Sequence, residues 1–231
     1  MFFCGIFGVA INQLMFFKGL DITTPVNASL MMVTTPILVI VIAILVKTDR
    51  FTWAKFAGIC LGALGAVFIL MGKDFNFSSS TALGDFFVFI NATSYGIYLS
   101  IVKPLMKKYH ALTIMKWVFL FGFIPVAIVG YPEFTQIDWQ SFTPHIWWSL
   151  LYVVVGVTCF AYLFNIFALS QVNPSVVGIY IYLQPLLAAI IAIYFGADKL
   201  DAVKVLAAAC IFLGVYLVSF YKTNIIKDEL I

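Results

Sequence analysis

Residues 36–44 read PILVIVIAI, and residues 185–193 read PLLAAIIAI. The prolines match, Leu38 matches Leu187, and both stretches close on Ile-Ala-Ile. The two stretches are separated by 149 residues. The same offset holds without a gap for four further pairs: Pro25 and Pro174, Asp49 and Asp198, Lys55 and Lys204, and Gly65 and Gly214. Chance matches among apolar residues would not stay in register in this way. The chain therefore contains a tandem duplication, which in a membrane protein is typical of transporters.

The composition is that of a membrane protein. Hydrophobic residues make up 64% of the chain and charged residues 10%, and the mean hydropathy is +1.09. A water-soluble domain does not have this composition. We predict an all-α integral membrane protein, a polytopic bundle of about eight transmembrane helices built from inverted repeats. Each predicted helix is an apolar stretch of about 20 residues, long enough to cross the hydrocarbon of a bilayer: 2–20, 25–46, 52–71, 82–102, 113–130, 146–169, 174–196 and 202–220.

The two copies are predicted to lie upside down relative to each other. Five membrane crossings separate any residue of the first copy from its partner in the second, and an odd number reverses the direction. We expect a first copy of three helices over 1–73, a second copy of five helices over 82–222 and a cytoplasmic tail at 223–231. The helices at 82–102 and 113–130 have no counterparts before the first copy, which predicts that two N-terminal helices are missing from the sequence.

The placement of lysine and arginine predicts the orientation. If successive loops alternate sides, nine basic residues fall on one side and four on the other. We therefore expect a multi-pass protein of the cell (inner) membrane with a cytoplasmic C-terminus. The positive-inside rule puts the larger group in the cytoplasm: Lys47, Arg50, Lys55, Lys103, Lys107, Lys108, Lys116, Lys222 and Lys227.

Several function classes find no support in the sequence. No basic stretch interleaved with aromatic residues suggests nucleic-acid binding. Neither the catalytic pair of an intramembrane protease nor the clustered ligands of a zinc enzyme can be recognised. We predict no enzyme activity, no metal and no cofactor, and nothing indicates an oligomer, although one is compatible with the sequence. Free, buried thiols are expected for the cysteines, which lie in apolar stretches without a Cys-x-x-Cys pair: Cys4, Cys60, Cys159 and Cys210.

The order of the motifs resembles that of a known family. Each copy has a leucine followed five residues later by a proline, a second proline eleven residues on, an acidic residue thirteen further, and then a glycine-containing helix. This pattern is similar to the EamA-type exporters of the drug/metabolite transporter superfamily, which have ten helices. The resemblance implies transport of amino acids, metabolites, nucleotide sugars or drugs, without naming the substrate. The second copy reads Ala168-Leu169, Pro174, Pro185, Asp198 and Gly214, and the first reads Gly19-Leu20, Pro25, Pro36, Asp49 and Gly58.

Polar side chains within the apolar stretches are candidates for a substrate pathway. A polar group in hydrocarbon is costly unless it faces the bundle interior or water. Tyrosine rings would stack on a small polar metabolite, and amides would donate and accept hydrogen bonds. Hydrogen bonding between helices explains any single one of them equally well. We expect the candidates, most of which recur at helical spacing on one face, to line one central cavity: Asn12, Asn27, Thr34, Asn91, Tyr95, Tyr98, Tyr162, Asn165, Tyr180 and Gln184.

Two further features have two explanations each. Pro36 and Pro185 interrupt their helices near the membrane centre, and the freed carbonyl groups either bind substrate or accompany a kink that shapes the cavity. We favour the kink. Acidic residues at two loops are next to basic ones, as Asp49-Arg50 and Asp198-Lys199. Helix capping or an exposed ion pair is the expected role there, and a gate is the alternative.

Together these observations predict a secondary transporter. It would move a small polar metabolite, amino acid-like or drug-like, across the cytoplasmic membrane by alternating access between the repeats, as an exporter. The expected partners are a small-molecule substrate and the lipid bilayer. No acidic residue or histidine lies clearly in midmembrane, so the sequence does not indicate a coupling ion. Two alternatives stay open: a truncated, inactive product, and a nontransporting membrane scaffold or receptor subunit.

Overall fold

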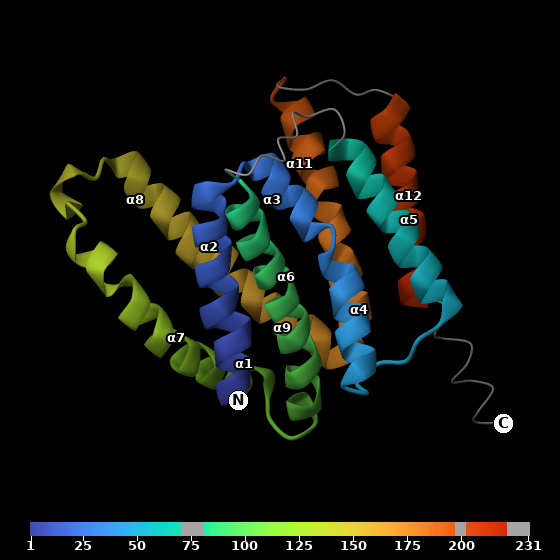
Figure 1. Ribbon diagram of the computed structural model, residues 1–231, viewed down its shortest axis with the longest axis horizontal. Helices are drawn as coiled ribbons and strands as arrows, with labels where there is room; N and C mark the ends of the chain where they lie inside the picture. The colour runs from blue at the N-terminus through green and yellow to red at the C-terminus, as the bar shows by residue number, and fades with distance from the viewer. Residues whose placement is uncertain (71–80, 197–201, 221–231) are drawn as a thin grey trace.

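The computed structural model describes residues 1–70, 81–196 and 202–220 and consists there of helices and the turns between them, with no strand in these ranges (Figure 1). Eight helical stretches in the described ranges are long and apolar enough to cross a membrane. The predicted all-α fold class and the predicted number of spanning helices are therefore confirmed. The predicted tail at 223–231 and the loop pair Asp198 and Lys199 lie outside the described residues.

The first copy contributes three spanning stretches. Thr24 fixes the start of the second one, because it is extended and its hydroxyl accepts a hydrogen bond from the amide of Asn27 at 3.1 Å. Pro25 follows in the first turn, where a missing amide hydrogen costs nothing. The stretches are α1 (Phe2–Gly5) continued by η1 (Ile6–Ile11) and α2 (Asn12–Ile22); α3 (Pro25–Met32) with α4 (Thr35–Leu45); and α5 (Trp53–Leu70).

The second copy contributes five spanning stretches, and a short turn, η3 (Trp139–Ser141), joins the second of them to the third. We call the end of the bundle with Lys47, Arg50, Lys107 and Lys108 the basic end, and the end with η3 and the α2–α3 junction the far end (lower and upper in Figure 1). The stretches are α6 (Ala82–Val102) with η2 (Lys103–Lys107); α7 (Ala111–Thr135); α8 (Pro144–Leu151), η4 (Tyr152–Phe160) and α9 (Ala161–Gln171); α10 (Pro174–Ile179), η5 (Tyr180–Tyr182) and α11 (Leu183–Tyr194); and α12 (Ala202–Phe220).

Both copies interrupt the regular α-helix at related positions. The wider π-helical turns of η1 and η4 overlap when the first copy is shifted by the 149-residue offset. The second span of each copy breaks immediately before its mid-helix proline, at residues 33–34 before Pro36 and over η5 before Pro185. Proline cannot donate the hydrogen bond that would continue the helix. The breaks before the prolines recur because the prolines themselves are duplicated.

Helices α5 and α12, which the duplication relates, lie side by side and run in opposite directions (Figure 1). A Cβ added at Gly58 would lie 2.7 Å from the carbonyl oxygen of Gly214, and one added at Gly65 would lie 2.6 Å from that of Ala207. This is one contact seen twice, because the offset relates Gly58 to Ala207 and Gly65 to Gly214. Such reciprocity is the property of a twofold axis. The two copies therefore meet about a pseudo-twofold axis, in inverted orientation.

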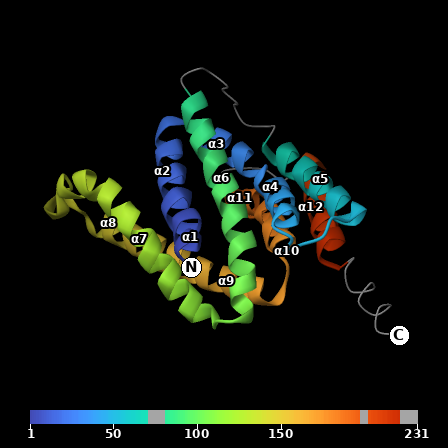
Figure 2. The same ribbon diagram turned by 60° about the horizontal axis from the view of Figure 1, so that its bottom comes forward.

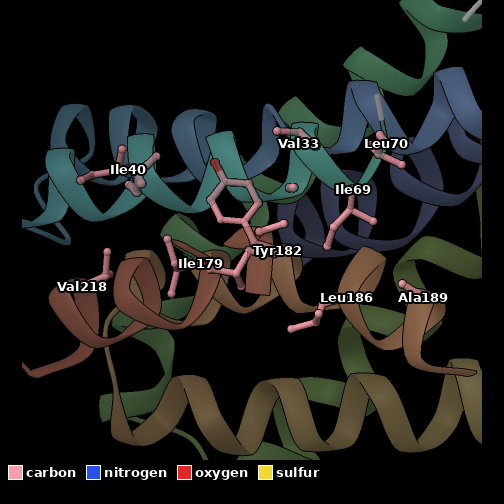
Figure 3. Close-up of a cluster of buried hydrophobic side chains, with 13 residues drawn as sticks. Val33, Ile40, Ile69, Leu70, Ile179, Tyr182, Leu186, Ala189 and Val218 are labelled. Carbon is pink, nitrogen blue, oxygen red and sulfur yellow. The ribbon is translucent and has the colours of Figure 1, made fainter. Parts of the chain in front are cut away.

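A hydrophobic core lies between the copies beside this axis (Figure 3). Tyr182 of η5 is buried at its centre, and its ring occupies the space that a side chain at Gly62 of α5 would need. Ile40 of the first copy and Ile179 and Leu186 of the second belong to the same cluster. Lipid tails are as apolar as these side chains, so moving the side chains from lipid into the core gains little. Close packing is therefore what stabilises the contact.

The spanning stretches are buried to very different extents. Residues buried inside the bundle make up 56% of the apolar window of Ala82–Lys107 but 6% of that of Pro144–Gln171. Helix α8 and the later part of α7 stand away from the other helices in both views, whereas the start of α7 packs against α1 and η1 (Figures 1 and 2). The exposed side chains of α7 and of Pro144–Gln171 include Ile128, Trp148 and Phe164, a surface that suits hydrocarbon and not water.

The cysteines are free, but the prediction that all four are buried is wrong. Cys4 is buried and Cys210 is partly buried, whereas Cys60 and Cys159 are exposed. In a membrane bundle the outward face is apolar as well, because it contacts lipid. An apolar surrounding sequence therefore does not tell whether a thiol lies inside the bundle or on its surface.

Candidate functional site

A cavity lies between the two copies and has two chambers. The larger has a volume of about 460 Å³ and the smaller one of about 220 Å³. Both are lined by Phe16 and Met32 of the first copy and by Ile181 and Gln184 of the second. The chambers are thus adjoining parts of one space at the interface of the copies. The volume of the larger chamber is within the range of sites for small molecules, roughly 300–1,000 Å³.

The smaller chamber is the more polar of the two, because seven of its eleven lining residues carry a polar side-chain group. Its lining residues come from α2, α3, α6, α9, η5 and α11, and four of these six elements belong to the second copy. None of the described residues that line it carries a charge. Its polar side chains are four amides and three phenols: Asn12, Asn91, Asn165 and Gln184, and Tyr95, Tyr98 and Tyr162.

Hydrogen bonds across helices hold these side chains in place. The side-chain amide of Asn91 donates to the backbone carbonyl of Asn12 at 2.7 Å, and the Asn12 amide donates to the carbonyl of Asn91 at 3.4 Å. The hydroxyl of Tyr162 donates to the carbonyl oxygen of Gly8 at 2.7 Å. Gly8 lies in η1, so the irregular turn of the first copy accepts a hydrogen bond from the second copy.

Three buried polar atoms of this chamber have no hydrogen-bond partner. They are the side-chain oxygens of Asn91 and Asn165 and the hydroxyl of Tyr98. The side-chain nitrogen of Asn165 donates to the hydroxyl of Tyr95, and the side-chain oxygen of Asn165 has no partner. A buried polar atom without a partner costs about 1–3 kcal/mol. A ligand whose hydrogen-bonding groups reach these atoms would recover this free energy.

The larger chamber is mainly apolar and extends to the far end. Its lining includes Leu20 in the last turn of α2, Pro25 at the start of α3 and Leu70 at the end of α5. Pro25 and Ser29 are exposed, so the chamber reaches the molecular surface there. The rest of its own lining consists of Ala28, Val33, Ile69, Tyr182, Pro185 and Ala188.

The structure brings most of the side chains singled out in the sequence into this cavity. Seven of the ten polar candidates line the smaller chamber. Of the two helix-breaking prolines, Pro185 lines the larger chamber, whereas Pro36 is buried outside both. The seven are Asn12, Asn91, Tyr95, Tyr98, Tyr162, Asn165 and Gln184.

The other three candidates lie elsewhere, which corrects the expectation of one cavity for all ten. Asn27 is buried and donates to Asp85 at 3.4 Å. The hydroxyl of Thr34 donates to the carbonyl oxygen of Met31 at 2.6 Å. Tyr180 is 49% exposed. Thr34 and Tyr180 lie in the two helix breaks, where a face deduced from regular helical spacing no longer applies.

A buried ion pair joins the two copies at the basic end. Nζ of Lys55 lies 2.5 Å from Oδ1 of Asp49, and the two side chains are 4% and 1% exposed. The hydroxyl of Ser175 donates to Oδ2 of Asp49 at 2.5 Å, and the amide of Asn173 donates to Oδ1 at 3.0 Å. Asp49 and Lys55 belong to the first copy, and Asn173 and Ser175 to the second. We call these four residues the basic-end network.

Asp49 is held ionised. Burial by itself raises its pKa, but hydrogen bonds from Lys55 and Ser175 and the charge of Lys55 outweigh burial and lower the pKa below the ordinary value of 3.8. The expectation of an exposed pair with Arg50 is therefore wrong. Arg50 contributes its backbone amide, at 2.7 Å, and the lysine six residues along is the partner.

Sequence reasoning missed Lys55, Asn173 and Ser175 as functional candidates. A partial signal was available, because Asp49 and Lys55 are both repeated in the second copy. Asn173 and Ser175 are not repeated, and the related positions hold Thr24 and Val26. No spacing rule joins residues 124 and 126 positions apart.

Two further contacts tie the second copy at the two ends. At the basic end, Nζ of Lys103 donates to the carbonyl oxygens of Leu169 at 2.6 Å and Val172 at 2.7 Å, at the end of α9. A cation is favoured there because it binds carbonyls that the helix leaves over. At the far end, the buried carboxylate of Asp85 on α6 accepts from the hydroxyl of Thr23 at 2.5 Å.

Comparison with known proteins decides the family. The EamA-like transporter family matches residues 1–71 and 82–220, nearly all of the described chain. The chain belongs to the EamA-like transporter family. It is a multi-pass membrane transporter, in agreement with the resemblance read from the proline and acidic motifs. Among the described residues, no group of three His, Cys, Asp or Glu side chains is arranged to hold a metal ion.

Similar proteins are known from all domains of cellular life. An uncharacterized transporter of Archaeoglobus fulgidus is 29% identical over 215 residues, which cover 91% of this chain and 72% of the relative. The uncharacterized transporter YyaM of Bacillus subtilis is 20% identical over 213 residues, 91% of this chain and 70% of the relative. The WAT1-related protein At3g18200 of Arabidopsis thaliana is 24% identical over 250 residues, 96% of this chain and 65% of the relative.

The fold also occurs among solved structures. One crystal structure superimposes with a TM-score of 0.77 at 17% sequence identity, over 96% of this chain and 75% of the other. At this identity the likeness shows the fold alone. In the plant relative At3g18200 and in this solved structure, the matched part is 65% and 75% of the other protein's length.

Proposed function

We propose that this transporter carries a small polar metabolite, amino acid-like or drug-like, across the cytoplasmic membrane by alternating access, and that it acts as an exporter. The polar chamber between the inverted copies carries the proposal. Polar side chains within a membrane are expensive unless they serve a pathway or a structural bond. Three of the polar atoms there have no structural bond. The proposed pathway residues are Asn12, Asn91, Tyr95, Tyr98, Tyr162, Asn165 and Gln184.

The inverted arrangement supports alternating access. In a pair of inverted repeats, each copy can adopt the conformation of the other. When the two copies exchange conformations, a central site that was open to one side of the membrane opens to the opposite side. The contacts of Gly58 with Gly214 and of Gly65 with Ala207 support this exchange. Each contact turns into the other when the two copies exchange positions, so the packing is similar in both states. The shared lining of the two chambers supports a site at the interface between the copies, which is the interface that would rearrange.

The two ends of the bundle support one state of such a cycle. The larger chamber reaches the surface at the far end, and the basic-end network joins the copies at the other. We propose that the basic end, with its excess of lysine and arginine, faces the cytoplasm together with the C-terminus. This state would then be open to the outside and closed to the inside, the state from which an exporter releases its substrate.

The first experiment identifies the substrate and tests for a carrier. Metabolites retained by cells are compared with and without the gene, and those that accumulate in its absence are loaded into proteoliposomes containing the purified protein. We expect saturable efflux of at least one of them. Absence of flux for all of them would favour the inactive product or the scaffold.

A disulfide cross-link tests alternating access. A Cβ at Gly178 of α10 would lie 3.2 Å from Cβ of Val39 of α4, close to the spacing of a disulfide. This pair joins the two copies in the half of the bundle next to the basic end. With the native cysteines replaced, we expect oxidation of the Val39→Cys/Gly178→Cys variant to stop flux and reduction to restore it. The oxidised single variants are the controls and should keep their flux. Full flux with the bond formed would exclude opening at the basic end.

A further inference from the structure

Two of the three buried polar atoms without a partner in the smaller chamber are amide oxygens, which can only accept. The clearest case is Asn91, which is 4% exposed. Its amide nitrogen donates to the backbone carbonyl of Asn12, which can only accept, so the orientation of the amide group is fixed. The side-chain oxygen of Asn91 is left over, buried and without a partner. This oxygen can be satisfied only by a hydrogen-bond donor.

Two neighbours point to the same chemistry. Asn165 donates its amide nitrogen to the Tyr95 hydroxyl, and its oxygen is also buried without a partner. The hydroxyl of Tyr98, a residue 1% exposed, is unpartnered too and can either donate or accept. A head group that fits these atoms therefore offers two N–H donors and has at most one acceptor for Tyr98.

The charge of the chamber excludes one class of head group. Among the described residues that line it there is no Lys, Arg or His to pair with an anion. A carboxylate has no donor of its own and would lose its hydration without an ionic partner. A cation is better tolerated, because carbonyl oxygens and the faces of tyrosine rings attract it. The rings of Tyr95 and Tyr98 lie next to each other there, with centroids 6.3 Å apart.

The larger chamber adds a second requirement. It adjoins the polar one through Phe16, Met32 and Ile181, and its own lining is mainly aliphatic. An apolar group there would replace poorly bound water by van der Waals contacts. A ligand that fills both chambers is amphipathic.

We propose that the cavity binds amphipathic molecules whose head group is a primary ammonium or a carboxamide and whose body is apolar, and that it rejects the matching carboxylates. The N–H donors meet the free oxygens of Asn91 and Asn165, and the body lies in the larger chamber. This inference rests on the cavity of the proposed function and, of its two substrate classes, selects the drug-like one, because an amino acid carries a carboxylate.

Three probes with the same body test the proposal. They are 3-phenylpropylamine, 3-phenylpropanamide and 3-phenylpropanoate. The amide and the carboxylate have nearly the same shape and differ only in the group on the carbonyl carbon, NH₂ in the amide and O⁻ in the carboxylate. Binding to the full protein in lipid nanodiscs is measured by titration calorimetry at neutral pH. We expect the amine and the amide to bind, and the carboxylate to bind at least about tenfold more weakly than the amide, as for the loss of a hydrogen bond in a buried site.

Two variants locate the selectivity. Asn165→Leu removes one free oxygen at similar size, and we expect it to reduce the preference for the amide over the carboxylate by about tenfold. Tyr98→Phe keeps the ring and removes only the hydroxyl. It should therefore lower the affinity for the amide and leave the affinity for the amine nearly unchanged. Tyr180→Phe is the matched control, because Tyr180 is half exposed and outside the chambers. It should leave the affinities for all three probes unchanged.

The outcomes separate this inference from the carrier proposal. Equal or tighter binding of the carboxylate, or no binding of amine and amide, would overturn the inference even if saturable flux of another metabolite is found. Selective binding of the amide without any flux would support the inference and overturn the carrier proposal. An unchanged selectivity in both Asn165→Leu and Tyr98→Phe would show that recognition occurs elsewhere.

Discussion

Each end of the bundle has a buried carboxylate that joins the two copies, and the two differ in their partners. At the basic end, Asp49 of the first copy binds the start of α10 in the second and forms an ion pair with Lys55. At the far end, Asp85 of the second copy binds residues near the start of α3 in the first, and these are Thr23 and Asn27. The first contact combines two charges and the second one charge with neutral donors. The comparison teaches that the contacts that join the copies at the two ends can differ in strength, so that the two ends need not open equally easily.

The largest effect is expected from breaking the ion pair. Asp49→Ala leaves the ammonium of Lys55 buried without its counter-charge, which typically costs about 3–5 kcal/mol. We expect a loss of that size in the free energy of unfolding, measured in detergent by denaturant titration. Replacing both partners, as Asp49→Ala/Lys55→Met, should recover most of it, because an apolar pair of similar volume has no unpaired charge. A double variant as unstable as the single one would contradict the ion-pair explanation.

A smaller effect is expected at the far end. Asp85→Ala leaves a hydroxyl and an amide without their acceptor, and unsatisfied neutral groups cost about 1–3 kcal/mol. The same titration measures the loss. Thr23→Val, which removes one donor at constant shape, is the matched variant and should cost less than Asp85→Ala. If Asp85→Ala lowered the free energy of unfolding as much as Asp49→Ala does, the proposed difference in strength between the contacts at the two ends would be refuted.

The smallest effect is expected from pH. The pKa of Asp49 is lower in the folded protein than its ordinary 3.8, so its contribution to stability is complete above that value and is lost as the pH falls below it. Between about pH 5 and 8 we expect no change in the stability difference between the wild type and Asp49→Ala/Lys55→Met. Unfolding titrations at several pH values test this. A difference that falls steadily from pH 8 to 5 would mean that Asp49 takes up a proton in the working range.

Much of the fold could be predicted from the sequence, because the bilayer limits the choices. Eight apolar stretches of sufficient length, and a duplication separated by an odd number of crossings, lead to inverted helical repeats. Seven of ten pathway candidates also line the cavity, since a polar side chain in an apolar helix tends to face the interior. Thr34 and Tyr180 do not, because both lie in helix breaks whose extent the sequence did not give.

The basic-end network could not be predicted, and the reason is distance along the chain. Asp49 and Ser175 are 126 residues apart, and whether they meet depends on how two whole copies dock. The same docking decides which oxygens of Asn91 and Asn165 stay without a partner. The sequence by itself determined the membrane class, the helices and the duplication, because these follow from local hydropathy and residue order. Only the tertiary structure decided which end is tied by an ion pair and what the cavity offers a ligand, because both depend on contacts between side chains that no local pattern connects.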